Sequence, residues 1–300
     1  MRIIITGGTG LIGQALSASL VADSHEVIVL SRNPDRAPPV PGARLVRWDA
    51  QSADGWSQLA DGAHGVVNLA GASLNRRWNS RNKRLIRQSR LDAGRAVVDA
   101  VNRAQAKPRV VVQASGAGAY GPRGDEAITA EAGFADTFLG RTAEAWEDST
   151  APVEDHGVRR VIIRTGLALS MEGGALPLLV LPFRLFVGGP LGSGGQWMPW
   201  IHMDDQVRAI RFLMETGTAN GPFNLSAPHP VTHAAFSQTL GQVMGRPSFF
   251  RVPSFTVRLV LGEMSTVVLD GQRAVPKRLL DLGFDFHFPT VREALQDLLC

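Results

Sequence analysis

The feature that most constrains this chain is its start, where a glycine-rich turn joins an apolar strand to a helix. Ile3–Thr6 is β-prone, an apolar helical pattern follows the turn, and Val27–Leu30 reads as a second strand. This order predicts a βαβ unit with glycines at its first crossover. Such glycines allow a tight turn, let backbone N–H groups approach a pyrophosphate, and let the helix lie close to the strand. We therefore predict a dinucleotide site made by Gly7, Thr9, Gly10, Leu11, Ile12 and Gly13; a glycine turn without a ligand is the alternative.

The end of the second predicted strand indicates which dinucleotide binds. A site for NAD usually places an acidic residue there for the ribose hydroxyls, whereas NADP requires a cation for its 2′-phosphate. This chain has Ser31 and Arg32, with Arg36 as a possible second contact. These residues predict NADP(H); a solvated surface arginine is the alternative.

The composition limits the class of protein. With 44% hydrophobic and 19% charged residues, 300 residues suffice for a large α/β domain and a smaller one. The single cysteine, Cys300, excludes a disulfide framework within one chain and fits a reducing, cytoplasmic location. Prolines and glycines interrupt the apolar stretch 175–191, so we expect no membrane-spanning segment.

The charge distribution gives no sign of a nucleic-acid partner. The net charge is +4, and eight basic residues fall between Arg76 and Arg95. Apart from Trp78, no aromatic residues are interleaved with them as nucleic-acid stacking would require. We expect a solvated helix face, a small molecule as substrate, and neither nucleic acid nor membrane as partner; the oligomeric state stays open.

Further strand patterns predict a Rossmann-type, doubly wound parallel sheet of α/β class. After a Pro-rich loop over 33–42, strands are expected at 44–48, 66–71, 109–113, 161–164 and 223–225. A long helix is expected over 80–104, with an apolar stripe made of Leu85, Ile86, Val97, Val98 and Val101. Ligands of such sheets lie at the carboxyl ends of the strands. Asp49 could there bond the adenine amine, and Leu69, Ala70 and Gly71 leave room for the cofactor.

A shift to glycine and proline after Ser170 predicts a second unit threaded through the first. We expect residues 1–170 to form the NADP-binding domain, with 200–228 returning to it. Residues 171–199 and 229–300 would form a smaller α/β C-terminal domain that binds substrate. In it we expect helices over 232–244, 254–261 and 289–299; a helix over 206–214 would have Asp204 or Asp205 as its N-cap.

The order of motifs resembles the extended short-chain dehydrogenase/reductase superfamily. The matching segments are TGGTGLIG, NLAG, ASGAGAYG, RTGLAL, WIHMDD and NLSAP. More narrowly, RRWN, LPFR, GGPLGSG and LDGQR resemble its atypical branch, the NAD(P)-dependent epimerase family with a C-terminal domain of unknown function. The resemblance implies that NADP is lined by Ser31, Arg32, Leu69, Ala70, Arg90, Leu167 and Ala168. Gly195 departs from the pattern, because a polar side chain is common there.

The catalytic pair of that superfamily, Tyr-x-x-x-Lys, is absent. Counting back from Glu147, which resembles the glutamate that follows the family lysine, gives Ala143 and Leu139, and neither side chain can transfer a proton. The candidate catalytic residues are therefore Tyr120, Ser115 and His202. Packing is the alternative role for Tyr120, and a hydrogen-bonded structural role for His202. Arg90 is the candidate cation near the ribose, and no metal site is expected, because His202 and Asp204 are too few ligands for zinc.

Two functions fit these observations. The first is an NADP(H)-binding epimerase or reductase-like enzyme acting on a small polar substrate, sugar-like or anionic, with a non-standard acid/base. The second is a non-catalytic NADP(H)-binding sensor or regulatory protein. The missing pair favours the sensor, and the glycine-rich wall over 188–197 favours the enzyme.

Overall fold

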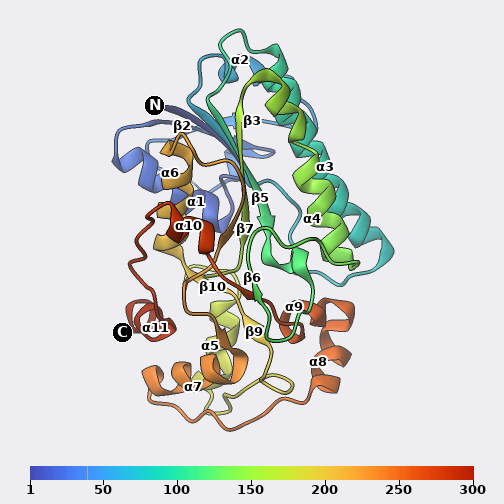
Figure 1. Ribbon diagram of the computed structural model, residues 1–300, viewed down its shortest axis with the longest axis vertical. Helices are drawn as coiled ribbons and strands as arrows, with labels where there is room; N and C mark the ends of the chain where they lie inside the picture. The colour runs from blue at the N-terminus through green and yellow to red at the C-terminus, as the bar shows by residue number, and fades with distance from the viewer. Residues whose placement is uncertain (39) are drawn as a thin grey trace.

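A seven-stranded parallel sheet forms the centre of the protein. The computed structural model describes residues 1–38 and 40–300, so Pro39 of the predicted 33–42 loop lies outside the described residues. The strand order is β11-β7-β5-β4-β1-β2-β3, and every neighbouring pair is parallel (Figure 1). The strands are β1 (Arg2–Thr6), β2 (Glu26–Ser31), β3 (Arg44–Arg47), β4 (Gly65–Asn68), β5 (Val110–Gly116), β7 (Arg159–Thr165) and β11 (Gly221–Leu225). This is the doubly wound Rossmann-type arrangement that the sequence predicts.

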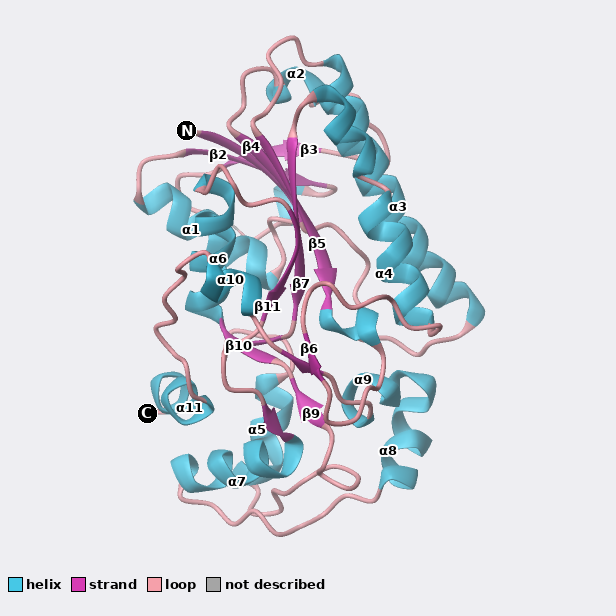
Figure 2. Cartoon of the chain, viewed as in Figure 1, coloured by secondary structure: helices cyan, strands magenta, loops and turns pink. Residues whose placement is uncertain are grey.

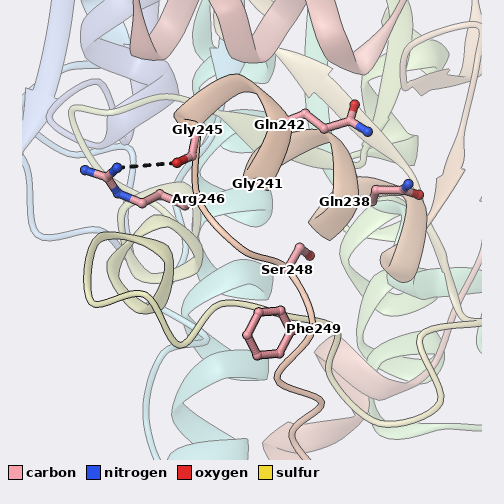
Figure 3. Close-up of a pocket in the computed structure, with 7 residues that line it drawn as sticks. All are labelled: Gln238, Gly241, Gln242, Gly245, Arg246, Ser248 and Phe249. Carbon is pink, nitrogen blue, oxygen red and sulfur yellow. Dashed lines mark hydrogen bonds between the residues drawn. The ribbon is translucent and has the colours of Figure 1, made fainter.

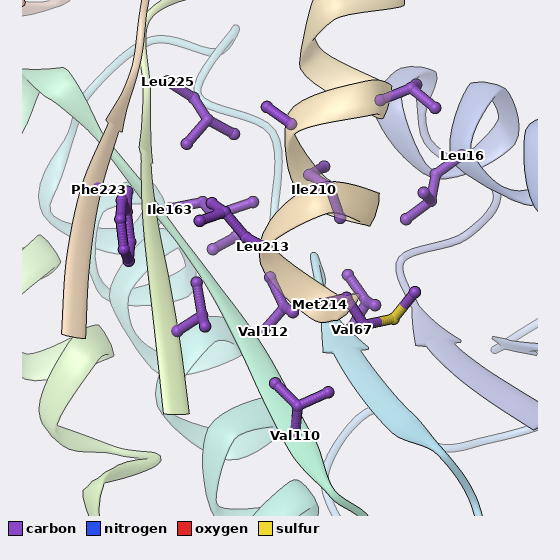
Figure 4. Packing of buried hydrophobic residues seen from close by; sticks show 14 of the residues in the cluster. Leu16, Val67, Val110, Val112, Ile163, Ile210, Leu213, Met214, Phe223 and Leu225 are labelled. Atoms are coloured by element: carbon purple, nitrogen blue, oxygen red, sulfur yellow. The ribbon is translucent and has the colours of Figure 1, made fainter. Parts of the chain in front are cut away.

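The strand sequences are apolar on both faces because helices cover both faces of the sheet. Ile3, Ile4 and Ile5 of β1 are all fully buried although their side chains alternate in direction. α1 (Leu11–Ala22) and α6 (Met203–Glu215) pack on one face, where Leu16 of α1 and Leu213 of α6 meet the strand residues (Figure 4).

The opposite face is covered by α2 (Ser57–Ala60) and by the long α3 (Ser80–Arg103), with α4 (Phe138–Asp148) packed beside α3 (Figure 2). The predicted apolar stripe of α3 holds at Ile86, Val97 and Val101, which are buried. It fails at Leu85, which is 45% exposed. Short 3-10 turns complete this unit: η1 (Pro34–Arg36), η2 (Ala117–Tyr120) and η3 (Ala151–His156).

A smaller unit lies beyond the carboxyl ends of the strands (Figure 1). Its core joins Leu176, Phe183, Trp200, Phe236 and Leu295. Its helices are α5 (Leu176–Arg184), α7 (His233–Met244), α8 (Ser254–Leu261), α9 (Thr266–Leu269) and α11 (Val291–Leu299), with η4 (Gly262–Ser265) between α8 and α9. α10 (Lys277–Asp281) instead packs beside β11.

Three short strand pairs stand apart from the large sheet. β8 (Leu167–Leu169) pairs with β10 (Trp200–His202), β9 (Trp197–Met198) with β12 (Val231–Thr232), and β6 (Ala127–Ile128) with β13 (Arg273–Ala274). After β10 the chain returns to the large sheet through α6 and β11. Over residues 1–38 and 40–300, no helix combines the length and apolar character needed to cross a bilayer.

Candidate functional site

The glycine turn after β1 brings backbone so close to backbone that side chains would not fit there. Gly7 has φ +68°, and a Cβ placed on it would lie 2.8 Å from the backbone of Leu69 at the end of β4. A Cβ on Gly13 would lie 2.5 Å from the carbonyl oxygen of Gly7. The turn is therefore built to bring bare backbone close to other backbone, as a bound pyrophosphate requires.

The N-terminus of α1 faces this turn without a competing anion. Gly10 is its N-cap, no side chain caps it, and its first turn holds no acidic residue. The first N–H groups of a helix lack intrahelical partners and carry partial positive charge. α1 thus offers backbone donors to a phosphate.

Ser31 and Arg32 stand at the carboxyl end of β2, as predicted. Ser31 is buried, and its hydroxyl accepts a hydrogen bond from the backbone N–H of Asn33 at 3.3 Å. Arg32 is exposed, and within the described chain its guanidinium forms neither an ion pair nor a hydrogen bond. A cation without an internal partner is thus available where an adenosine 2′-phosphate would lie.

Asp49 follows β3, but its carboxylate already has local partners. It accepts hydrogen bonds from the backbone of Gln51 and Ser52, both at 2.8 Å, and from the Ser52 hydroxyl. Partial burial acts to raise the pKa of Asp49, but the hydrogen bonds from Ser52 and Gln51 lower it overall. An adenine amine would have to share the Asp49 carboxylate with Gln51 and Ser52, so the contact between Asp49 and adenine stays a prediction.

The end of β4 is held by a chain of buried polar side chains. The Thr6 hydroxyl donates to Asn68 Oδ1 at 2.6 Å and accepts from the backbone N–H of Ala70 at 3.2 Å. Asn68 in turn donates to Gln113 of β5 at 2.8 Å. These bonds fix Leu69 and Ala70 beside the glycine turn.

Arg90 of α3 is a buried cation without a buried anion. It is 9% exposed, and its Nη1 donates to the carbonyl oxygens of Ala72 at 3.0 Å and Ile86 at 2.9 Å. Its guanidinium lies 4.7 Å from the centre of the Trp146 ring, and no carboxylate pairs with it in the part of the chain described. Burial lowers the pKa of Arg90 to about 10. A Cβ on Gly71 would lie 3.0 Å from its Cζ, so the cation sits at the carboxyl end of β4.

Ala168 lies near the start of α1, whereas its neighbour Leu167 packs against the core of the smaller unit. A Cβ on Gly174 would lie 3.1 Å from Leu11 Cδ2 and 3.8 Å from the carbonyl oxygen of Ala168. The predicted contacts at 7–13, 69–71, 90 and 168 therefore meet at one edge of the sheet, while Arg32 and Asp49 end neighbouring strands at that edge.

Tyr120 is sequestered in the protein interior. It is 1% exposed, its hydroxyl donates to Asn224 Oδ1, and it accepts from Arg164 Nη1 at 3.1 Å. Burial raises the pKa of Tyr120 despite the nearby Arg164. The proton of the hydroxyl thus points at Asn224 of β11, which is the geometry of the packing alternative.

Ser115 belongs to the same buried network. Its hydroxyl donates to Glu147 Oε1 at 2.6 Å, and Glu147 receives two hydrogen bonds from Arg164, at 2.8 and 2.9 Å. Arg164 and Glu147 are 5% and 6% exposed. The sequence reasoning missed this ion pair, although a lone arginine in the strand VIIRT was a usable signal, because a buried charge requires a partner.

His202 occupies a structural position. Its Nδ1 accepts the backbone N–H of Asp204 at 3.1 Å, so the N-cap of α6 is His202. The predicted caps, Asp204 and Asp205, are wrong because both lie inside the first turn. The Nε2 of His202 lies 3.3 Å from Asp297 without hydrogen-bond geometry, and burial lowers the pKa of the ring.

The two positions where the superfamily has its catalytic tyrosine and lysine hold apolar side chains in the structure. Leu139 begins α4, and its Cδ1 would lie 3.0 Å from a Cβ on Gly118. Ala143 is buried one turn later. Arg90 supplies a buried positive charge in this region, and its guanidinium lies on the ring of Trp146, which is one turn beyond Ala143.

A cluster of possible metal ligands is formed by Asp204 and Asp205, in the first turn of α6, and by His287. Its carboxylates and its ring nitrogen already form hydrogen bonds with one another or with the neighbouring backbone. Asp205 accepts the backbone N–H groups of His287 and Phe288, and Asp204 lies 2.9 Å from the His287 ring nitrogen. The cluster is accounted for by this bonding.

The described residues line two cavities, of which one lies beside the segment after Tyr120 and the other at the end of α7. A cavity of about 220 Å³ opens beside the chain that follows Tyr120, with Asp125, Trp197 and Asp270 in its wall. A larger one of about 450 Å³ lies at the end of α7 (Figure 3) and holds no predicted site residue. It is lined by Gln238, Gly241, Gln242, Gly245, Arg246, Ser248 and Phe249.

Comparison with known proteins agrees with this geometry. Residues 3–138 match the NAD dependent epimerase/dehydratase family, and residues 252–298 match a domain of unknown function, DUF1731. The chain is 41% identical to the epimerase family protein SH2119 of Staphylococcus haemolyticus, over 99% of both chains.

Two solved structures are similar along the whole chain. The human epimerase family protein SDR39U1, solved with NADPH, superposes with a TM-score of 0.89 at 34% identity, covering 99% of each chain. A nucleoside-diphosphate sugar epimerase from Corynebacterium glutamicum gives a TM-score of 0.80 at 34% identity, covering 100% of this chain and 58% of that one.

Proposed function

Because the chain belongs to the epimerase family defined by the NAD dependent epimerase/dehydratase domain and DUF1731, we propose that it is an NADP(H)-binding enzyme of epimerase or reductase type. Its substrate would be a small polar molecule, sugar-like or anionic, bound between the two units. The related nucleoside-diphosphate sugar epimerase makes nucleotide sugars the first class to test. We also keep a cytoplasmic location as a proposal.

The observation that carries the cofactor assignment is the pairing of a bare glycine cradle with two cations that lack anionic partners. Gly7 and Gly13 admit the pyrophosphate, Arg32 would hold the 2′-phosphate, and the human relative was solved with NADPH. Arg90 would donate its remaining N–H groups to the ribose or the pyrophosphate. The residues present therefore fit NADP(H).

Bound NADPH or NADP⁺ supplies or accepts a hydride. Near the reacting end of the cofactor, Leu139 and Ala143 would exclude water because their side chains are apolar. Arg90 would supply a fixed positive charge. Without the tyrosine–lysine pair, proton movement would depend on the substrate's own groups or on bound water. Tyr120 and Ser115 would orient the ends of the strands through Glu147 and Arg164.

A second candidate function, an NADP(H) sensor without turnover, is favoured by one specific observation. Each of the three predicted acid/base candidates is already committed: Tyr120 to Asn224, Ser115 to Glu147, and His202 to the cap of α6.

The test is turnover with a defined panel. The protein with NADP⁺ or NADPH is mixed with nucleoside-diphosphate sugars in deuterated water, and proton NMR follows epimerised or reduced product. The enzyme proposal expects product with at least one sugar, at an unchanged rate in Tyr120→Phe. Tight NADPH binding with no product across a broad panel would favour the sensor. Absence of NADPH binding would refute both.

A further inference from the structure

One end of the smaller unit presents apolar side chains to solvent. Among the described residues, fourteen large hydrophobic side chains are exposed, and ten of them fall within 178–187 and 249–260. They are Leu178, Leu181, Leu185, Phe186, Val187, Phe249, Phe250, Phe255, Leu259 and Val260. Scattered exposed leucines need no explanation, but a concentration of this kind marks an interaction surface.

The two segments lie together. The backbone N–H of Phe250 donates to Gly188 at 3.1 Å, that of Val252 donates to Pro190 at 3.0 Å, and the Phe249 and Phe250 rings lie 4.5 Å apart. The guanidinium of Arg246 covers the Phe186 ring at 4.4 Å. The exposed side chains of α5, the 185–187 turn and the 249–250 segment therefore form a continuous surface, which we call the apolar tip. The hollow in Figure 3 adjoins it at Arg246 and Phe249.

Phe186 occupies a backbone position that normally takes glycine. It follows the C-cap of α5, with φ +61°, and is 54% exposed. Its N–H bonds Phe183, and the N–H of Val187 bonds Pro182, which is the Schellman pattern that ends helices at glycine. A side chain with a Cβ is strained there. Phe186 therefore strains the backbone, and its ring, which points to solvent, gains little stabilisation from burial in return.

The rim of the tip is basic and contains no acid. Arg184, Arg246 and Arg251 are exposed, and none forms an ion pair within the described chain. The chain has 27 acids in 300 residues, yet 173–203 and 216–262 have none, where the average density would give about seven. From the neighbouring α11, Glu293 is engaged by Thr290 and Asp297 lies beside His202.

We infer that the apolar tip docks onto an anionic lipid surface. Protruding apolar side chains that enter the interface, together with a basic rim that meets phosphate headgroups, are the two signals that peripheral membrane binding requires. Such binding needs no spanning helix. A second copy is a poorer occupant, because an isologous contact would gather the arginines of both copies around one interface and bring no carboxylate from the tip.

The test uses the full-length protein and vesicles of phosphatidylcholine, with or without about a third of phosphatidylglycerol. We expect sedimentation with the anionic vesicles only, weakening as salt rises. Phe186→Gly should lower that binding roughly tenfold while the melting temperature stays equal or rises, because glycine accepts the positive φ. Arg246→Gln should lower the anionic preference. The control Leu280→Ser removes an equally exposed apolar side chain on α10 and should bind as the unmodified chain does.

NADPH affinity, unchanged in all three variants, would show that each is folded. Failure to sediment with anionic vesicles, or equal binding by Phe186→Gly, would overturn the inference. A stable dimer in solution that Phe186→Gly dissociates would also overturn it and assign the tip to a second copy.

Discussion

Arg90 gives the sharpest test of the proposed cofactor site, because burying its charged guanidinium destabilises the protein when no cofactor is bound. Burial lowers its pKa to about 10. The charged form therefore costs about 3 kcal/mol in the fold, since a lowering of the pKa by one unit equals about 1.4 kcal/mol. This cost applies in full at every pH below that lowered pKa. Two hydrogen bonds to backbone carbonyls and the Trp146 contact offset part of it.

Arg90→Met keeps the side-chain volume and removes the charge. We expect the free energy of unfolding without cofactor to change by no more than about 1 kcal/mol, because the relief of burial and the two lost hydrogen bonds nearly cancel. The affinity for NADPH should fall by about 1.5–3 kcal/mol, the value of a hydrogen bond to a charged group. Urea unfolding of the apoprotein and NADPH fluorescence titration measure the two quantities.

The two results together decide the role of Arg90. A loss of more than about 3 kcal/mol in apoprotein stability with unchanged NADPH affinity would make it a structural residue and refute the reasoning. Arg90→Lys serves as the comparison, because lysine keeps the charge but lacks the planar group that stacks on Trp146.

Three further perturbations test other parts of the structure. Gly13→Ala should weaken NADPH binding at least tenfold, because its Cβ would meet backbone at 2.5 Å; unchanged titration would show that the turn can yield. Glu147→Gln should cost about 3–5 kcal/mol in urea unfolding by leaving Arg164 unpaired, whereas Asp35→Asn at an exposed pair should cost under about 1 kcal/mol; equal costs would contradict this. Burial lowers the pKa of His233 to about 4 from 6.5, so the unfolded chain binds the proton first. Stability should fall by about 2–3 kcal/mol between pH 6.5 and pH 4.5, and His233→Asn should lack this component if the ring is the cause.

The sheet and the cofactor edge were predictable because their determinants are local. Val27–Leu30 and Val110–Val112 are apolar on both faces, as buried parallel strands require, and the turn glycines have the spacing of a dinucleotide-binding turn. The helix boundaries at Ser80 and His233 follow from local caps at Asn79 and Thr232.

The candidate catalytic residues could not be judged from sequence, because their roles depend on distant partners. Tyr120 is committed to Asn224, 104 residues later, and Ser115 to Glu147, 32 residues later. His202 looked like an acid/base because the competing capping role depends on where α6 begins, and one residue decides that. Leu85 breaks the stripe of α3 because it lies outside the buried face of the helix, on which its neighbour Ile86 is fully buried.

The central claim is that the chain holds NADP(H) through Arg32. The most direct measurement is the ratio of the NADH and NADPH dissociation constants, in the unmodified chain and in Arg32→Asp at one ionic strength. The account predicts that the unmodified chain binds NADPH at least tenfold more tightly, as a charged contact to phosphate implies, and that the variant removes or reverses the preference. Equal constants for the two dinucleotides in the unmodified chain would contradict it.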